Sequence, residues 1–117
     1  MALFANNACK AWCDINMTGT AVINDDFGVS SVSDHSTGDN TINFDTNMGN
    51  TNFCVTACSE NWETTNGDSY TVVSGMAGSG TRAVGSYRFR CIRLRFDTGN
   101  IPQFKDSTHA SFSFFGD

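Results

Sequence analysis

Short stretches in which apolar and polar residues alternate constrain this chain more than any other feature. In residues 10–17, Ala11, Cys13, Ile15 and Met17 place an apolar side chain at every second position. Such alternation is typical of a strand with one buried face, because successive side chains of a strand point to opposite sides. No stretch shows the periodicity of an amphipathic helix or of a coiled coil. The chain is therefore expected to consist of strands.

Segments of this kind recur along the chain and end at Gly, Asn or Asp. They are expected at residues 10–17, 21–23, 27–32, 40–45, 53–58, 70–74, 86–96 and 110–114. The run Asn24-Asp25-Asp26 is expected to separate the second and third segments, and residues 33–39 are expected to form a hairpin turn. Roughly seven to nine short strands are typical of a β-sandwich or barrel. We expect an all-β fold: a single compact antiparallel β-sandwich, jelly-roll-like in topology.

Composition agrees with this fold and limits the number of domains. The 117 residues suffice for one domain. Charged residues make up only 16%, and the abundant Asn, Ser and Thr are poor helix formers. Ten Phe supply a large apolar core. Residues 9–117 are expected to form the sandwich, and residues 1–8, with Leu3 and Phe4, are expected to form an N-terminal docking arm.

Residues 86–96 are expected to form the longest strand, although their apolar pattern changes phase halfway. The apolar residues are Tyr87, Phe89 and Cys91 at odd positions, then Ile92, Leu94 and Phe96 at even positions. A β-bulge at Cys91-Ile92 would bring both halves onto one apolar face. It would also place four arginines, here called the arginine row, on the opposite face: Arg88, Arg90, Arg93 and Arg95.

The arginine row is the one basic feature of an acidic chain. The net charge is −5, which argues against nucleic-acid binding. The row has two interpretations: a solvated outer face, or a contact with an acidic neighbouring subunit or with sulfated or phosphorylated glycans. Arginine is suited to the second role because it forms two-point pairs with anionic groups. Together with Leu3 and Phe4, the row supplies the candidate partner contacts.

The five cysteines are Cys9, Cys13, Cys54, Cys58 and Cys91. Cys13 follows Cys9 by four positions, and Cys58 follows Cys54 by four. In a strand, residues four positions apart are about 13 Å from each other, so the two cysteines of either pair can neither bind one metal together nor form a disulfide with each other. Cross-strand disulfides of Cys9 or Cys13 with Cys54 or Cys58 remain geometrically open. An odd number of cysteines and a reducing cytosol favour the other interpretation, buried and inert thiols.

Residues with catalytic or metal-binding potential occur only in sequence typical of turns. His35 and His109 are expected to be exposed turn residues rather than bases or ligands. Four aspartates are likewise expected to serve turns rather than a Ca²⁺ site: Asp25, Asp26, Asp34 and Asp39. No nucleophile motif and no pair of catalytic carboxylates is present. We therefore expect no enzyme, no cofactor and no metal.

Targeting and membrane signals are also missing from the sequence. No apolar run approaches the roughly 20 residues that span a bilayer, and the first residues lack the pattern of a signal peptide. The chain is expected to fold in a cytosol and not to insert into a membrane.

Ordered motifs in about the first 58 residues resemble the distal, C-terminal module of bacteriophage tail fibres. They follow one another as Ala11-Trp12, Gly19-Thr20, Val29-Ser30-Ser31, Thr37-Gly38-Asp39 and Asn43-Phe44. The segment Asn52-Phe53-Cys54-Val55 and the closing Phe115-Gly116 fit the same pattern, and the rest matches in length and strand character. The resemblance implies a phage virion protein that forms a homotrimer.

In tail fibres this module follows an attachment region and a long shaft, whereas here Met1 lies eight residues before Cys9. A tip without a shaft is expected to dock by its own surface. We therefore expect a trimeric capsid decoration or cement protein that binds the major capsid protein or another virion protein. The alternative is a receptor-binding tip of a fibre or spike that contacts a host-surface glycan or protein. Either protein is expected on the virion surface, after assembly in the host bacterial cytoplasm.

Overall fold

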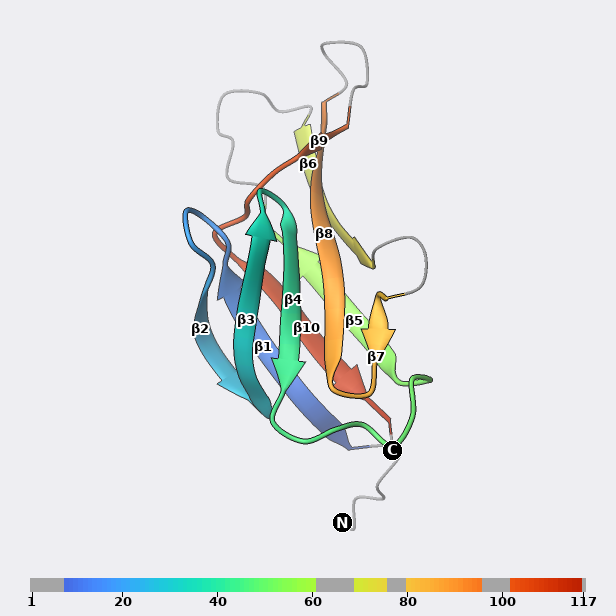
Figure 1. Cartoon of the computed structure of the whole chain (residues 1–117). Coiled ribbons are helices and arrows are strands. Elements are labelled where there is room, and N and C mark those ends of the chain that lie inside the picture. Colours follow the sequence, from blue (N-terminus) through green and yellow to red (C-terminus); the bar gives the residue numbers. More distant parts are fainter. Residues whose placement is uncertain (1–7, 61–68, 76–79, 96–101, 117) are drawn as a thin grey trace.

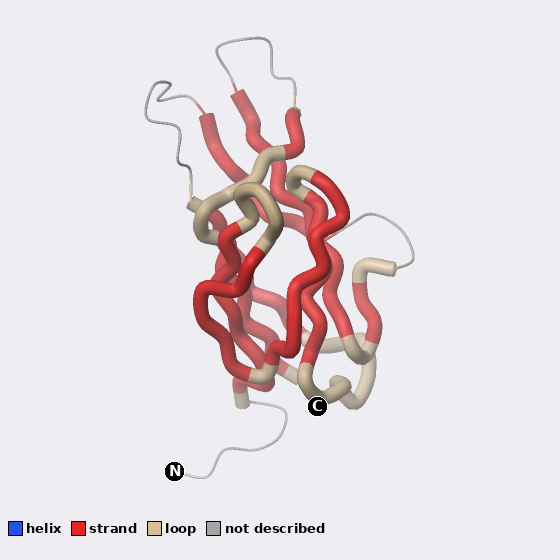
Figure 2. Tube along the Cα trace, turned by 60° about the vertical axis from the view of Figure 1, so that its left-hand side comes forward, coloured by secondary structure: helices blue, strands red, loops and turns tan. Residues whose placement is uncertain are grey.

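Ten strands, all paired antiparallel, make up the regular structure of the described chain. The computed structural model describes residues 8–60, 69–75, 80–95 and 102–116, and only the backbone at positions 69, 70 and 95. No helix occurs in these residues, which form two facing layers of strands joined by turns (Figure 2). The expected docking arm with Leu3 and Phe4 lies outside the described residues.

Four strands form the first layer, called sheet A. Their order across the sheet is β2 (Val22–Phe27), β1 (Cys9–Asn16), β10 (Ala110–Phe115) and β5 (Cys54–Ser59). The first and last strands of the chain therefore lie side by side in the middle of this sheet (Figure 1). Their alternating sequences turn one apolar face inward, and Ala11, Ile15 and Phe114 are buried there.

The second layer, sheet B, is organised around the longest strand. Its order is β3 (Val29–Ser36), β4 (Asp39–Phe44), β8 (Ser86–Arg95) and β6 (Ser69–Gly75), and two short strands, β7 (Arg82–Ala83) and β9 (Gln103–Phe104), also pair with β8. One edge of β8 is shared between β4 and β9. The change occurs at Cys91, whose N–H donates to the carbonyl of Gly38 at 2.8 Å and whose carbonyl accepts from the N–H of Lys105 at 3.1 Å.

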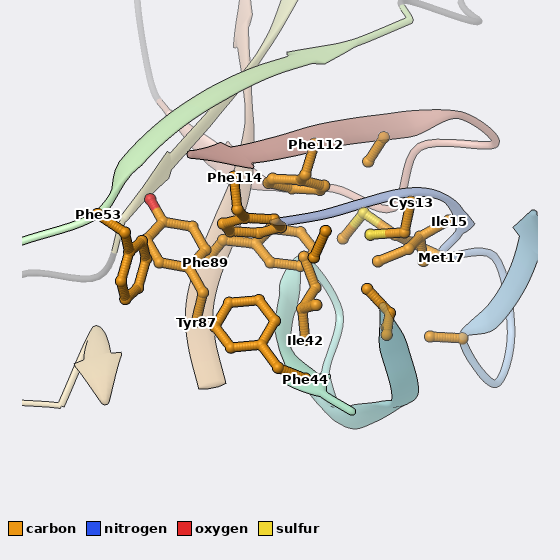
Figure 3. Close-up of a cluster of buried hydrophobic side chains, with 14 of the residues drawn as sticks. Cys13, Ile15, Met17, Ile42, Phe44, Phe53, Tyr87, Phe89, Phe112 and Phe114 are labelled. Carbon is orange, nitrogen blue, oxygen red and sulfur yellow. The ribbon is translucent and has the colours of Figure 1, made fainter. Parts of the chain in front are cut away.

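Aromatic side chains from both sheets fill the space between them (Figure 3). The ring of Phe44 from sheet B meets Phe114 from sheet A edge-on with centroids 4.9 Å apart, and Phe89 lies 4.4 Å from Phe112. Rings of this size bury large apolar areas and gain further from edge-to-face contact. The two facing antiparallel sheets and this shared core confirm the expected β-sandwich.

The prediction of a β-bulge in the longest strand is wrong. The pairing of β6 with β8 runs from Ser69↔Arg95 to Gly75↔Phe89 without a shift of register. Side chains of β8 therefore alternate throughout, and Ile92 shares the outer face with Arg88 and Arg90. The arginine row is divided, because Arg93 has the opposite parity. The phase change in the sequence instead marks the end of the core, since Cys91 is buried and the next three residues are only partly buried.

The turn between the second and third strands also lies elsewhere than predicted. The run Asn24-Asp25-Asp26 belongs to β2, and the chain turns at Gly28, which has a φ of +71°. These polar residues are tolerated within a strand because β2 is an edge of sheet A and most of its residues are exposed. The predicted hairpin is confirmed, but the turn expected over residues 33–39 is wrong in its bounds: β3 continues to Ser36, and Thr37-Gly38 is the two-residue turn before β4.

Candidate functional site

A shallow, open groove of about 460 Å³ lies on the outer face of sheet A. Two rows of facing residues cross β1, β10 and β5 and supply most of its lining: Trp12–Ser113–Thr56 and Asp14–Ser111–Cys58. Along β10, large Phe side chains point inward and small Ser side chains point outward. The outer surface is low at β10 because its serines are smaller than Trp12 beside them, and this difference produces the groove.

Asp14 is the centre of the polar network in this groove. Its Oδ1 accepts a hydrogen bond from the Ser111 hydroxyl at 2.9 Å. Its Oδ2 accepts from the Asn24 side-chain amide at 3.0 Å and lies 2.8 Å from Nδ1 of His109. Partial burial favours the neutral acid, but the hydrogen bonds from Asn24, His109 and Ser111 outweigh it, so the pKa of Asp14 lies below its ordinary value of 3.8. The carboxylate is therefore ionised and fixed in orientation.

His109 completes this network from the loop before β10. The hydrogen bond to Asp14 and the charge of that carboxylate raise the pKa of His109 above its ordinary value of 6.5. The loop is anchored by Ser107, which is fully buried and donates from its hydroxyl to the carbonyl of Glu60 at 3.0 Å. The imidazole itself is about half exposed, since 51% of its side-chain surface is accessible.

Trp12 supplies an aromatic surface next to these polar groups. Its side chain is 39% exposed, and Phe27, directly opposite on β2, is 56% exposed. Residues directly opposite in an antiparallel pair point to the same side of the sheet. The outer face of sheet A therefore presents two neighbouring exposed aromatic side chains at one margin of the groove.

The arginines of the predicted row do not join this site. Arg88 forms a two-point pair with Asp39 in sheet B, and Arg90 lies 3.8 Å from the same carboxylate. Arg93 donates to the side-chain carbonyl of Gln103, and the Arg95 side chain lies outside the described part of the chain. Part of the row thus serves contacts within the chain, and its role toward a partner stays a prediction.

The cysteines differ in exposure: two are buried, two are exposed, and Cys9 is partly buried. All five are free thiols. Cys13 and Cys91 are buried in the core, as expected, and burial raises the pKa of Cys13 to about 12 and that of Cys91 to about 11. The expectation of buried thiols is wrong for Cys54 and Cys58, which are exposed on β5.

The disulfides left open by the sequence do not form within the chain. Cys9 and Cys54 both pair with Phe115, from opposite sides of β10. Two strand spacings place them about 9–10 Å apart, beyond the reach of a disulfide. Cys13 is likewise separated from β5 by β10. It pairs with Phe112, and the residue that faces Phe112 on β5 is Ala57 rather than a cysteine.

The sequence pointed to neither the groove nor its residues. Both histidines are exposed, as expected, but His35 lies in β3 and contacts the Thr41 hydroxyl, whereas His109 belongs to the network around Asp14. Asp14 and His109 are 95 positions apart, and only the pairing of the first and last strands brings them together. The sequence feature that could have indicated the groove is the pair of small residues Ser111 and Ser113, which face outward on the last strand.

Among the residues that the structure describes, no cluster of three or more His, Cys, Asp or Glu is arranged to hold a metal ion. Nor does this part of the chain contain a helix that could cross a membrane. Comparison with known protein families, curated proteins and solved structures finds no match to this chain. What the groove offers is an aromatic face, several hydroxyls and a fixed carboxylate in an accessible concavity.

Proposed function

We propose that this chain is a binding module on the surface of a bacteriophage particle and that the groove on sheet A holds a carbohydrate of the host surface. The observation that carries the proposal is the position of the half-exposed Trp12 beside Ser111, Ser113 and the oriented carboxylate of Asp14 in one concavity. The phage context comes from the resemblance to fibre tips.

A sugar ring matches these groups because it has an apolar C–H face and a rim of hydroxyls. The indole plane is a rigid surface on which such a face packs, since an aromatic side chain loses little conformational freedom. An ionised carboxylate held by Ser111, Asn24 and His109 keeps one acceptor position on Oδ1, which can take a hydrogen bond from a sugar hydroxyl without further ordering. A few oriented polar groups beside an apolar surface are the usual composition of a small-ligand site.

The charge of the site narrows the class of glycan. Asp14 is ionised at neutral pH, and the chain as a whole has a net charge of −5. The Asp14 carboxylate accepts hydrogen bonds and therefore suits a sugar hydroxyl better than an anionic group, and the acidic surface would repel an acidic sugar at long range. We therefore expect a neutral glycan, such as a hexose-rich polysaccharide, rather than a sulfated or phosphorylated one.

The proposal is tested on an array of bacterial surface polysaccharides probed with labelled protein. The variants Trp12→Ala and Asp14→Asn should each lose binding to any glycan that the wild-type chain retains, by tenfold or more, equivalent to about 1.4 kcal/mol. Phe104→Ala is the matched control, because Phe104 is also an exposed aromatic residue, 52% accessible, but lies on sheet B. Equal binding by Trp12→Ala and the wild type would overturn the proposal.

Capsid decoration is the second candidate function, and a different surface favours it. Beyond the core, Val72, Ile92 and Phe104 face one another across β6, β8 and β9 on the outer side of sheet B. Val72 and Phe104 are 45% and 52% exposed, and Arg90 lies 5.1 Å above the ring of Phe104. An apolar row with a neighbouring cation suits contact with an acidic protein surface.

Copy number separates the two candidates. Quantitative mass spectrometry of purified particles that contain this chain counts its copies against the major capsid protein. Hundreds of copies per particle support decoration of the capsid lattice, and a few tens or fewer support a fibre or spike component. The glycan array remains informative in both cases, because a decoration protein that has no glycan site would give no signal dependent on Trp12.

A further inference from the structure

We propose that β5 pairs with β5 of a second copy of this chain about a two-fold axis at Thr56, and that two disulfides lock this pairing, each joining Cys54 to the partner's Cys58. This inference goes beyond the proposed carbohydrate site and does not depend on it. It rests on where β5 lies in sheet A, on the exposure of its two thiols and on their spacing.

One edge of β5 has no strand paired to it among the residues that the structure describes. This strand is the last of sheet A and pairs only with β10 among the described strands (light green in Figure 1). Edge strands are usually protected from pairing with other molecules by charged residues. Such residues occur in β2, with Asp25 and Asp26, and in β3, with Asp34, whereas the sequences of β5 and β6 contain no charge. Of these two uncharged edges, only β5 carries thiols.

The spacing of the thiols fits a symmetric pair of strands. Two identical antiparallel strands are related by an axis perpendicular to the sheet, so their outer faces stay on the same side. With the axis at Thr56, residue 54 of each copy lies opposite residue 58 of the other. Facing residues of antiparallel strands have Cα atoms about 4.5 or 5.5 Å apart, and both distances lie within the range that disulfides span.

The orientation of both side chains agrees with this arrangement. Cys54 and Cys58 face Phe115 and Ser111 of β10, which point outward, and both cysteines are exposed. Ala57 has the inward parity of Phe112, yet it is also exposed, so the core is incompletely covered at this edge. A second copy would continue sheet A across the axis and bring the two grooves next to each other on one face, because Thr56 and Cys58 line the groove.

The covalent step is thiol–disulfide exchange with a small-molecule disulfide such as oxidised glutathione. The Cys54 thiolate attacks one sulfur of that disulfide, forms a mixed disulfide and releases one glutathione thiolate. The partner's Cys58 thiolate then attacks the Cys54 sulfur and releases the second glutathione. Each protein disulfide therefore consumes one oxidised glutathione and yields two reduced ones. Six residues of edge pairing bury much less than the roughly 1,200 Å² of a stable interface, so the reduced pair is expected to dissociate.

The proposed two-fold axis relates two copies of the chain. It is therefore separate from the threefold association that the resemblance to fibre tips implies, and it can connect two trimers but cannot build one.

Paired cysteine variants test the register of this contact. The wild-type chain treated with oxidised glutathione should give a covalent species of twice the monomer mass on a non-reducing gel. Cys54→Ser and Cys58→Ser should each fail to form it, because each remaining thiol then faces a serine. An equimolar mixture of these two variants should restore the covalent pair through one disulfide.

Cys9→Ser is the matched control and should behave as the wild type, since Cys9 lies two strands from β5. Two results would overturn the proposal. A covalent dimer formed by Cys54→Ser alone or by Cys58→Ser alone would show that the same cysteine of two copies meets its counterpart. The absence of a covalent dimer from the equimolar mixture would show that residues 54 and 58 do not face each other. Circular dichroism of each variant confirms that it is folded.

Discussion

Arg88 and Asp39 lie on neighbouring strands of sheet B and share two hydrogen bonds of 2.9 Å, from Nε to Oδ1 and from Nη2 to Oδ2. The Asp39 side chain is only 10% exposed, and the hydrogen bond from Arg88 lowers the pKa of that carboxylate. A carboxylate with so little access to water needs such a partner, because burial removes its hydration. Arg88 therefore stabilises the fold.

Replacement of Arg88 tests this role. Arg88→Ala leaves Asp39 with the more distant Arg90, so the melting temperature should fall by roughly 5 °C. Arg88→Lys retains the charge but not the two-point geometry, so its melting temperature should lie between those of the wild type and Arg88→Ala. Thermal unfolding followed by circular dichroism measures both. An unchanged melting temperature in Arg88→Ala would mean that Arg88 is free to serve a partner instead.

The His109–Asp14 contact should make stability depend on pH. The pKa of His109 is raised in the folded chain, so this contact stabilises fully below the ordinary value of 6.5 and is lost as the pH rises through the folded value. The pKa of Asp14 is lowered, so its carboxylate remains charged throughout that interval. Urea unfolding of the wild type and His109→Gln should differ more at about pH 5.5 than at about pH 8.5. A larger difference at the higher pH would contradict the assigned ion pair.

Gly38 and Gly19 form a matched pair for testing the junction of β4, β8 and β9. Both have a φ of +69°. A Cβ at Gly19 would meet nothing within 4 Å, whereas one at Gly38 would lie 2.5 Å from the carbonyl oxygen of Cys91 and 2.9 Å from the nitrogen of Lys105.

Alanine at Gly19 should therefore cost only the left-handed strain of about 1–2 kcal/mol. Alanine at Gly38 adds overpacking, for a total of about 2–5 kcal/mol. Chemical denaturation gives both free energies of unfolding. Equal losses would show that the backbone contacts at Gly38 relax without cost.

Thiol labelling should separate the cysteines by environment. At about pH 8 the exposed Cys54 and Cys58 should react with iodoacetamide, because the reagent has direct access to their thiols. Cys13 and Cys91 should react only after unfolding, since they are buried and their pKa values are about 12 and about 11. Mass spectrometry of peptides from the folded and unfolded chain measures this order, and rapid labelling of Cys13 in the folded chain would contradict it.

The β-sandwich could be predicted because its signal is local. Alternation in residues 10–17 and 110–114 records which side chains are buried, and a two-residue period permits only a strand. The same local signal explains why the bulge predicted at Cys91-Ile92 is wrong. Alternation reports where apolar residues lie, but it does not show whether the strand bulges or passes beyond the core, and the latter depends on the length of the opposite sheet.

The groove could not be predicted because it depends on strand order. Asp14, Ser111 and Cys58 become neighbours only when β1, β10 and β5 are adjacent, and the separation of these residues in sequence carries no such information. The exposure of Cys54 and Cys58 has the same origin, since an edge strand and a central strand can share one alternating pattern. Arg88 and Asp39, 49 positions apart, are likewise joined only by the pairing of β4 with β8.

The most direct test of the carbohydrate proposal is a map of where a bound glycan contacts the folded chain. Amide spectra of isotope-labelled protein, recorded with and without an oligosaccharide retained on the array, locate the perturbed residues. We predict that the amides of residues 12–14, 56–58 and 111–113 shift, with the indole N–H of Trp12, and that those of β3 and β9 do not. Shifts confined to Val72, Ile92 and Phe104 on the outer side of sheet B would contradict the proposed site.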